Sequence, residues 1–210
     1  MSTHSYIAAL GLALLLLGQT QAQESVEPSV KEPALRLELL KRVKQDQAIR
    51  DELIRKGAAN PDRAILERME TIDKANTARV REIVQQHGWP TPALVGKDGA
   101  EAAFFIVQHS DYAFQKEMLP LVEKAYRCGG LSGQSYALLL DRVLVSEKKP
   151  QVYGTQAKRF EEWKNGEPTL EPIEDEVNVE KRRAEVGLST LAEYRALLKR
   201  LYFPQTQPKP

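Results

Sequence analysis

Polar side chains able to bind ligands or transfer protons are embedded in apolar sequence along one stretch of this chain. They are amides, an imidazole, carboxylates, a phenol and a guanidinium, here called the polar cluster: Gln108, His109, Asp111, Gln115, Asp141, Arg142, Gln151, Tyr153 and Gln156. A polar group inside a protein costs free energy unless it is paired. The pattern therefore predicts either a pocket that binds a ligand or a network that satisfies itself.

A binding or interaction module is the first interpretation of the polar cluster. Glutamine amides offer paired donors and acceptors, and Arg142 offers a planar fork that suits a carboxylate. Groups of this kind would suit a sugar, a peptide end or a fragment of the cell wall. The expected partner is thus an unknown small molecule or a component of the cell envelope.

A metal-dependent hydrolase is the second interpretation. His109, Asp111 and Asp141 are suitable ligand types for zinc or manganese, so a divalent metal is a candidate cofactor. Their spacing is not diagnostic, because the sequence contains no HExxH element and no adjacent His-Asp pair.

A purely structural role is the third interpretation. Asp141 and Arg142 would then form a partly buried ion pair, and His109 would bond to Asp111, Asp141 or a backbone carbonyl. Covalent catalysis is disfavoured, because no Gly-x-Ser-x-Gly turn occurs and Cys128 lies near a helix end, where the dipole disfavours a thiolate.

Composition and charge exclude several classes of function. The 210 residues carry 30 Lys and Arg against 29 Asp and Glu, a formal net charge of +1, so there is no electrostatic reason to expect a nucleic-acid partner. The single cysteine excludes an intrachain disulfide and a cysteine-rich zinc site.

The first residues have the pattern of a signal peptide. Residues 7–17 form an apolar run too short to span a bilayer comfortably, and Thr20-Gln21-Ala22 offers small residues where a signal peptidase cleaves. We therefore expect residues 1–22 to be removed and the protein to be exported, periplasmic or secreted, with no stable membrane span after cleavage. An uncleaved anchor is the alternative, because no Lys or Arg precedes the apolar run.

Helices are expected to position the polar cluster. Apolar spacings of three and four predict a first helix from Leu35 to Gly57 and a second from the Asn60-Pro61 start signal to Gly88. A third helix starting at Asp98 or Gly99 is apolar nearly all round and should be buried. Six basic residues of the first helix are expected to form a solvated face: Lys41, Arg42, Lys44, Arg50, Arg55 and Lys56.

A change of pattern follows Pro150. Strand-compatible residues surround Gly154, and Lys164-Asn165-Gly166 signals a turn, so the sequence predicts a small β-hairpin over about 150–173. The expected fold is mainly α, an orthogonal or antiparallel helical bundle with this hairpin. The expected organisation is a polar linker over 23–33, a single helical domain over 34–203 and a disordered tail over 204–210.

Four motifs occur in a recognisable order along the chain. They are Gly88-Trp89-Pro90, Gln108-His109 with Asp111, Asp141-Arg142 and Tyr153-Gly154-Thr155-Gln156. In this order they resemble the uncharacterised bacterial domain family DUF6624, from about Leu35 to Tyr194. The resemblance implies no particular reaction, because the family has no established activity.

Overall fold

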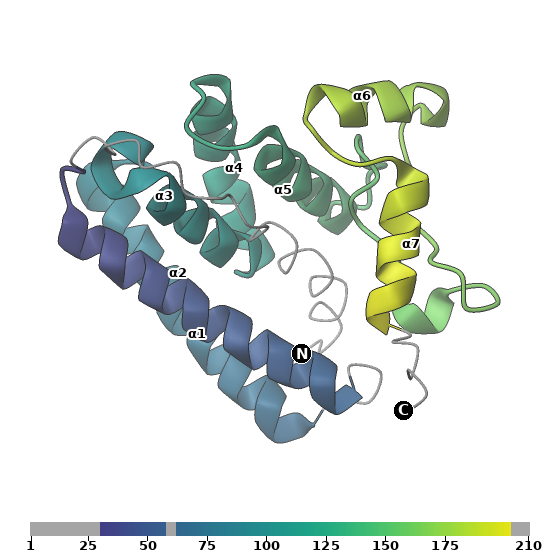
Figure 1. Cartoon of the computed structure of the whole chain (residues 1–210), viewed down its shortest axis with the longest axis horizontal. Coiled ribbons are helices and arrows are strands. Elements are labelled where there is room, and N and C mark those ends of the chain that lie inside the picture. Colours follow the sequence, from purple (N-terminus) through teal and green to yellow (C-terminus); the bar gives the residue numbers. More distant parts are fainter. Residues whose placement is uncertain (1–29, 58–61, 203–210) are drawn as a thin grey trace, which may run out of the picture.

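The computed structural model describes residues 30–57 and 62–202, and this part of the chain is mainly helical (Figure 1). The mainly α fold predicted from the sequence is confirmed. Its seven α-helices are α1 (Pro33–Gly57), α2 (Arg63–His87), α3 (Pro92–Gln108), α4 (Tyr112–Arg127), α5 (Gly133–Ser146), α6 (Val179–Glu185) and α7 (Leu191–Tyr202). The predicted signal peptide, the tail over 204–210, most of the linker and the Asn60-Pro61 signal lie outside the described residues.

The helices α1 and α2 form a long antiparallel pair (Figure 1). The Asp62 carboxylate caps α2 by accepting the Ala64 N–H at 2.9 Å. Gly88 ends α2 with a φ of 72°, in the left-handed region that glycine adopts without strain. Apolar side chains close the far end of the pair: Ile49, Leu53, Ile65 and Met69.

The helix α3 is the centre of the core, as its apolar sequence predicts. Phe104 and Val107 are fully buried, and α3 packs mainly on α1. It begins at Pro92 rather than at Asp98 or Gly99, because a kink at Gly96, with φ of 77°, joins a preceding turn of helix to the apolar part. The sequence pattern therefore detected only the second part of α3.

The helices α4 and α5 pack against each other and each begins with a side-chain cap. The Asp111 carboxylate accepts the Phe114 N–H at 2.9 Å, and the Ser132 hydroxyl accepts the Ser135 N–H at 3.1 Å. Asp111 therefore separates α3 from α4. The chain turns sharply at this point, just after His109.

The β-hairpin predicted over about 150–173 does not form a ladder. Isolated antiparallel bridges join Ala157 to Leu170 and Lys164 to Glu167, around the predicted turn, whereas the bridge between Gln151 and Ile173 is parallel. The physical reason lies on α5: the Asp141 carboxylate accepts the N–H groups of Val152, Tyr153 and Thr155. These donors are consequently not free to pair with a second strand.

The C-terminal helices α6 and α7 lie beyond α5 from the α1–α2 pair (Figure 1). The Tyr194 hydroxyl of α7 donates to the Thr155 carbonyl at 2.6 Å, which fastens α7 to the loop after α5. A second apolar cluster joins this loop to α7: Ala157, Trp163, Leu170, Tyr194 and Leu198. Over residues 30–57 and 62–202, no helix has the length and apolar character needed to cross a membrane.

Candidate functional site

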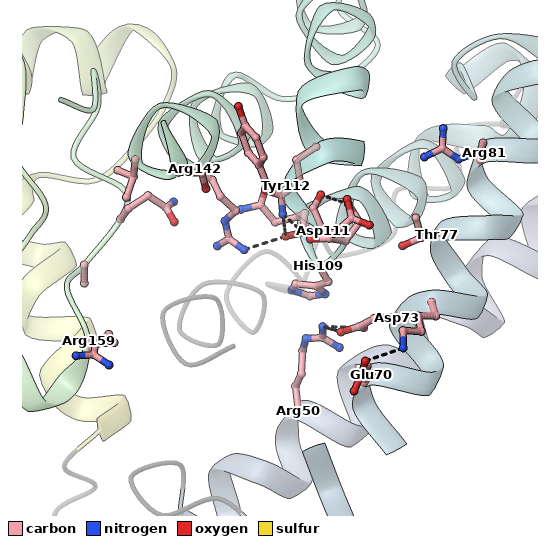
Figure 2. Close-up of a pocket in the computed structure, with 18 of the residues that line it drawn as sticks. Arg50, Glu70, Asp73, Thr77, Arg81, His109, Asp111, Tyr112, Arg142 and Arg159 are labelled. Carbon is pink, nitrogen blue, oxygen red and sulfur yellow. Dashed lines mark hydrogen bonds and ion pairs between the residues drawn. The ribbon is translucent and has the colours of Figure 1, made fainter. Parts of the chain in front are cut away.

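A cavity of about 710 Å³ lies between the α1–α2 pair on one side and α5 with its following loop on the other (Figure 2). Pockets that hold small molecules are typically about 300–1,000 Å³. The wall includes Asp73, Thr77 and Arg81 of α2, residues 108–112 between α3 and α4, and Arg142 of α5. Segments that are distant in sequence thus meet at one cavity.

Four buried ionisable side chains form a continuous line at this wall, here called the charge chain: Asp73, Arg50, Asp46 and His109. The Arg50 guanidinium donates to Asp73 at 2.9 and 3.0 Å and to Asp46 Oδ1 at 2.7 Å. The other oxygen of Asp46 lies 2.7 Å from His109 Nδ1. The charge chain therefore links α1, α2 and the end of α3 through charge-assisted hydrogen bonds.

The imidazole of His109 is held in one orientation. Its side chain is 2% exposed, and its Nδ1 donates to the Asp46 carboxylate if the ring is neutral. Burial, assisted by the positive charges of Arg50 and Arg142, lowers the pKa of His109 to about 4, although Asp46 opposes the shift. The neutral ring thus carries its lone pair on Nε2, for which the described part of the chain supplies no hydrogen-bond partner.

The two carboxylates of the charge chain differ in their pKa. Burial works to raise the pKa of Asp46, but the neighbouring His109 and Arg50 lower it below its ordinary value. Burial raises the pKa of Asp73 to about 6, against the opposing effect of Arg50. Asp46 is therefore the carboxylate that stays ionised beside the imidazole.

Arg142 is a half-buried cation in the cavity wall, bound by an uncharged neighbour. Its Nη1 donates to the Gln108 carbonyl at 2.8 Å. The Gln108 amide, assigned so that its oxygen faces the guanidinium, accepts from Nε and Nη2 at 3.1 Å each. Within residues 30–57 and 62–202 no carboxylate forms an ion pair with Arg142.

Burial lowers the pKa of Arg142 to about 10, which still leaves the guanidinium charged at neutral pH. In the view of Figure 2 the His109 ring lies between the Arg142 and Arg50 guanidinium groups. The cavity is therefore lined by His109 and by a cation, Arg142, that lacks an acidic partner in the described chain.

Residues 33–205 match the model of a family of unknown function, DUF6624. The chain belongs to the DUF6624 family. The match includes all seven described helices and every residue of the cavity wall. No curated protein and no solved structure matches the chain significantly.

In this DUF6624 chain the polar cluster divides into two groups. Six of its nine members line the cavity: Gln108, His109, Asp111, Gln115, Arg142 and Gln156. Asp141, Gln151 and Tyr153 do not line it. The predicted ion pair between Asp141 and Arg142 is absent from the described ion pairs, because Arg142 turns to Gln108 whereas Asp141 turns to the loop after α5.

Asp141 is fully buried and organises the loop after α5 of the DUF6624 fold. Its carboxylate accepts three backbone N–H groups, the shortest from Val152 at 2.7 Å, and the Thr155 hydroxyl at 3.0 Å. Burial raises the pKa of Asp141, and these backbone donors counteract the rise. Asp141 therefore fixes the start of the loop after α5.

The glutamines also make hydrogen bonds within the fold. Gln115 donates to the carbonyls of Gln108 and Ser110 at 3.1 and 2.9 Å. The Gln151 side chain bridges Gln156 and Glu171, through bonds of 2.8 to 2.9 Å. These amides hold the turn after α3 and the loop after α5.

The three proposed metal ligands do not form a metal centre in the described chain. Asp141 is saturated by loop donors, and Asp111 caps α4. In the described part of this DUF6624 chain no three His, Cys, Asp or Glu side chains are grouped so that they could hold a metal ion. His109 instead bonds to Asp46, a partner that sequence analysis did not identify.

Asp46, Arg50 and Asp73 were missed as site residues, and the solvated face predicted for Arg50 is wrong because Arg50 is 5% exposed. The sequence of α1 does indicate that Asp46 and Arg50 are buried. Leu39, Val43, Asp46, Arg50 and Leu53 follow one another at alternating spacings of four and three, which places an acid and a base on the apolar stripe. Opposite charges at core positions one turn apart indicate a buried ion pair.

Proposed function

We propose that this DUF6624 chain binds a small molecule with an acidic group, held by Arg142 in the cavity. The observation that carries the proposal is the absence of a carboxylate partner for Arg142 in the described chain. Buried and half-buried cations are normally paired, since desolvation of an unpaired charge is costly. An anionic ligand would supply that partner.

The guanidinium of Arg142 has donors left for a ligand. Of its five N–H groups, three are directed to the carbonyl and side-chain oxygens of Gln108. The two that remain, one on each Nη, suit the paired oxygens of a carboxylate or phosphate. Gln108 would thus hold the fork in position while the acidic group of the ligand binds its open side.

Other wall residues supply specificity. The His109 Nε2 accepts a hydrogen bond, and the hydroxyls of Thr77 and Ser146 line the same cavity. A ligand with an acidic group and a separate N–H or O–H donor would use both the guanidinium and the imidazole. Sugar acids, amino-acid derivatives and short peptide ends have this combination.

The protein is further proposed to work outside the cytoplasm. Support comes from the apolar run over 7–17 followed by Thr20-Gln21-Ala22. Intact-mass measurement of the protein recovered from its native host tests this: a chain that begins at Gln23 is expected. A chain that retains residues 1–22 would contradict cleavage.

Calorimetric titration with two probes, succinate and inorganic phosphate, tests the binding function. The Arg142→Gln variant should bind the preferred probe about 10-fold to 100-fold more weakly, because a charge-assisted hydrogen bond contributes about 1.5–3 kcal/mol. Arg127→Gln is the matched control, since Arg127 pairs with Glu123 on the exposed side of α4. Equal affinity of wild type and Arg142→Gln for both probes would refute the proposal.

A further inference from the structure

We infer that the Asp46–His109 pair is a general base that activates water to hydrolyse a small ester whose carboxylate is held by Arg142. This inference rests on the binding function proposed above and adds a reaction to the same cavity. It assigns distinct roles to three residues: Arg142 binds the acidic group, His109 takes the proton, and Asp46 positions His109.

The geometry around His109 is that of an oriented base. Asp46 Oδ2 lies 2.7 Å from Nδ1, and the other oxygen of Asp46 is held by Arg50 at 2.7 Å. An imidazole whose Nδ1 proton is fixed by a carboxylate presents the lone pair of Nε2 to its surroundings. His109 is among the residues that line the cavity, and the inference places this lone pair within it.

No side-chain nucleophile accompanies this base. The hydroxyl of Ser110, the adjacent residue, donates to the Val107 carbonyl at 2.7 Å and is thereby engaged with the backbone. In the described part of the chain no hydroxyl or thiol is hydrogen-bonded to His109, and Cys128 is exposed at the end of α4. The nucleophile available to His109 is consequently a water molecule in the cavity.

The proposed step is a hydrolysis that needs no redox partner. Water attacks the ester carbonyl carbon, and its proton passes to the lone pair of His109 Nε2. The bond from this carbon to the leaving oxygen then breaks, and Nε2 returns the proton to that oxygen. The products are an acid and an alcohol, and the Asp46 carboxylate stabilises the imidazolium that exists between the two transfers.

Ligand binding should make His109 a better base. The charged groups facing it are Asp46 and Arg50 from α1, Asp73 from α2, Arg142 from α5 and Asp111 at the start of α4. In the empty cavity the positive charges of Arg50 and Arg142 disfavour the imidazolium. A carboxylate bound at Arg142 offsets the effect of that cation and raises the pKa of His109 towards the neutral range, where a general base is most efficient.

Two alkyl esters test the inference: monoethyl succinate, which has a free carboxylate, and ethyl acetate, which has none; proton NMR follows the ethanol released. The wild type should hydrolyse the succinate ester with saturation kinetics and prefer it to the acetate ester. His109→Asn should lower kcat by about 100-fold or more, the usual effect of removing a general base. This variant keeps a side-chain N–H near the Nδ1 position and so preserves the bond to Asp46.

Two further variants separate binding of the ester by Arg142 from positioning of His109 by Asp46. Arg142→Gln should raise KM for the succinate ester, whereas the exposed control Arg127→Gln should leave it unchanged. Asp46→Asn should lower kcat at nearly constant KM and move the midpoint of the pH profile to lower pH, because the imidazolium loses its anionic partner. A purely structural role for Asp46 would not move that midpoint, and circular dichroism confirms that each variant is folded.

The possible outcomes distinguish the general base from the binding function on which it rests. If wild type and His109→Asn bind succinate equally and hydrolyse both esters at equal rates, the general base is refuted while the binding function stands. If the wild type binds neither succinate nor phosphate, both are refuted. A saturable succinate-ester reaction that depends on His109 and Arg142 supports both.

Discussion

His109 Nδ1 lies 2.7 Å from Asp46 Oδ2, although the two residues are 63 positions apart. The bond ties the turn between α3 and α4 to the middle of α1, and Arg50 extends it to Asp73 on α2. These side chains therefore hold three elements together, and three of them, His109, Arg50 and Asp73, line the cavity. Substitutions of these residues should therefore affect both the stability of the fold and the cavity.

Removal of Arg50 should strongly destabilise the fold. Arg50→Met leaves the carboxylates of Asp46 and Asp73 buried without their shared cation, at an expected cost of about 3–5 kcal/mol in the free energy of unfolding. Urea denaturation at neutral pH measures the loss. Arg63→Met is the matched control: Arg63 is 90% exposed, so its pair with Glu67 should contribute no more than about 0.5 kcal/mol.

His109 should make stability fall with acid. Its pKa is lowered to about 4 in the fold, against an ordinary value of 6.5, so the unfolded chain binds the extra proton between pH 6.5 and 4. The wild type should therefore lose up to about 3 kcal/mol relative to His109→Asn as the pH falls through this window. Denaturation curves of the two proteins at pH 7, 6, 5 and 4 measure the difference, and a constant difference would contradict it.

Asp73 should make the stability of the fold rise as the pH falls. Its pKa is raised to about 6 from an ordinary value of 3.8, so here the folded chain binds the extra proton between pH 6 and 3.8. Relative to Asp73→Asn, the wild type should gain up to about 3 kcal/mol as the pH falls from 6 to 3.8. The pH dependences of stability caused by His109 and by Asp73 oppose each other in the wild type. The two variants are needed to measure each one separately.

Asp141→Ala should destabilise the loop after α5. The change leaves three backbone N–H groups and the Thr155 hydroxyl without their acceptor, and each buried donor left unpaired costs about 1–3 kcal/mol. A loss of at least about 3 kcal/mol is expected in thermal and urea melts. Glu123→Ala, which breaks an exposed pair with Arg127, should change stability by less than about 1 kcal/mol. Equal losses for the two variants would show that Asp141 does not organise the loop.

The helices could be predicted from the sequence because their signals are local. Apolar spacing along α1 and α2, the glycine at 88 and the apolar sequence of α3 each depend on neighbouring residues. The first residues of the predicted hairpin form no ladder because the N–H groups of Val152, Tyr153 and Thr155 are taken by Asp141, on another element. A long-range acceptor of this kind leaves no periodic pattern in the strand itself.

The candidate site was likewise predictable only where its signal is local in the sequence. Gln108, His109 and Arg142 stand out as polar residues in apolar sequence, and all three line the cavity. Arg50 was interpreted as one basic residue among several on α1. Its burial depends on Asp73, which reaches it from α2, and that pairing requires the tertiary fold.

Anion binding by Arg142 is tested by its side-chain ¹⁵N NMR spectrum during titration with succinate and with inorganic phosphate. The Arg142 Nε signal should shift saturably with at least one probe, together with the imidazole signals of His109. The signal of Arg127 should remain unchanged. If the protein binds an anion to saturation and the Arg142 signal does not change, the anion binds elsewhere and the proposed site is wrong.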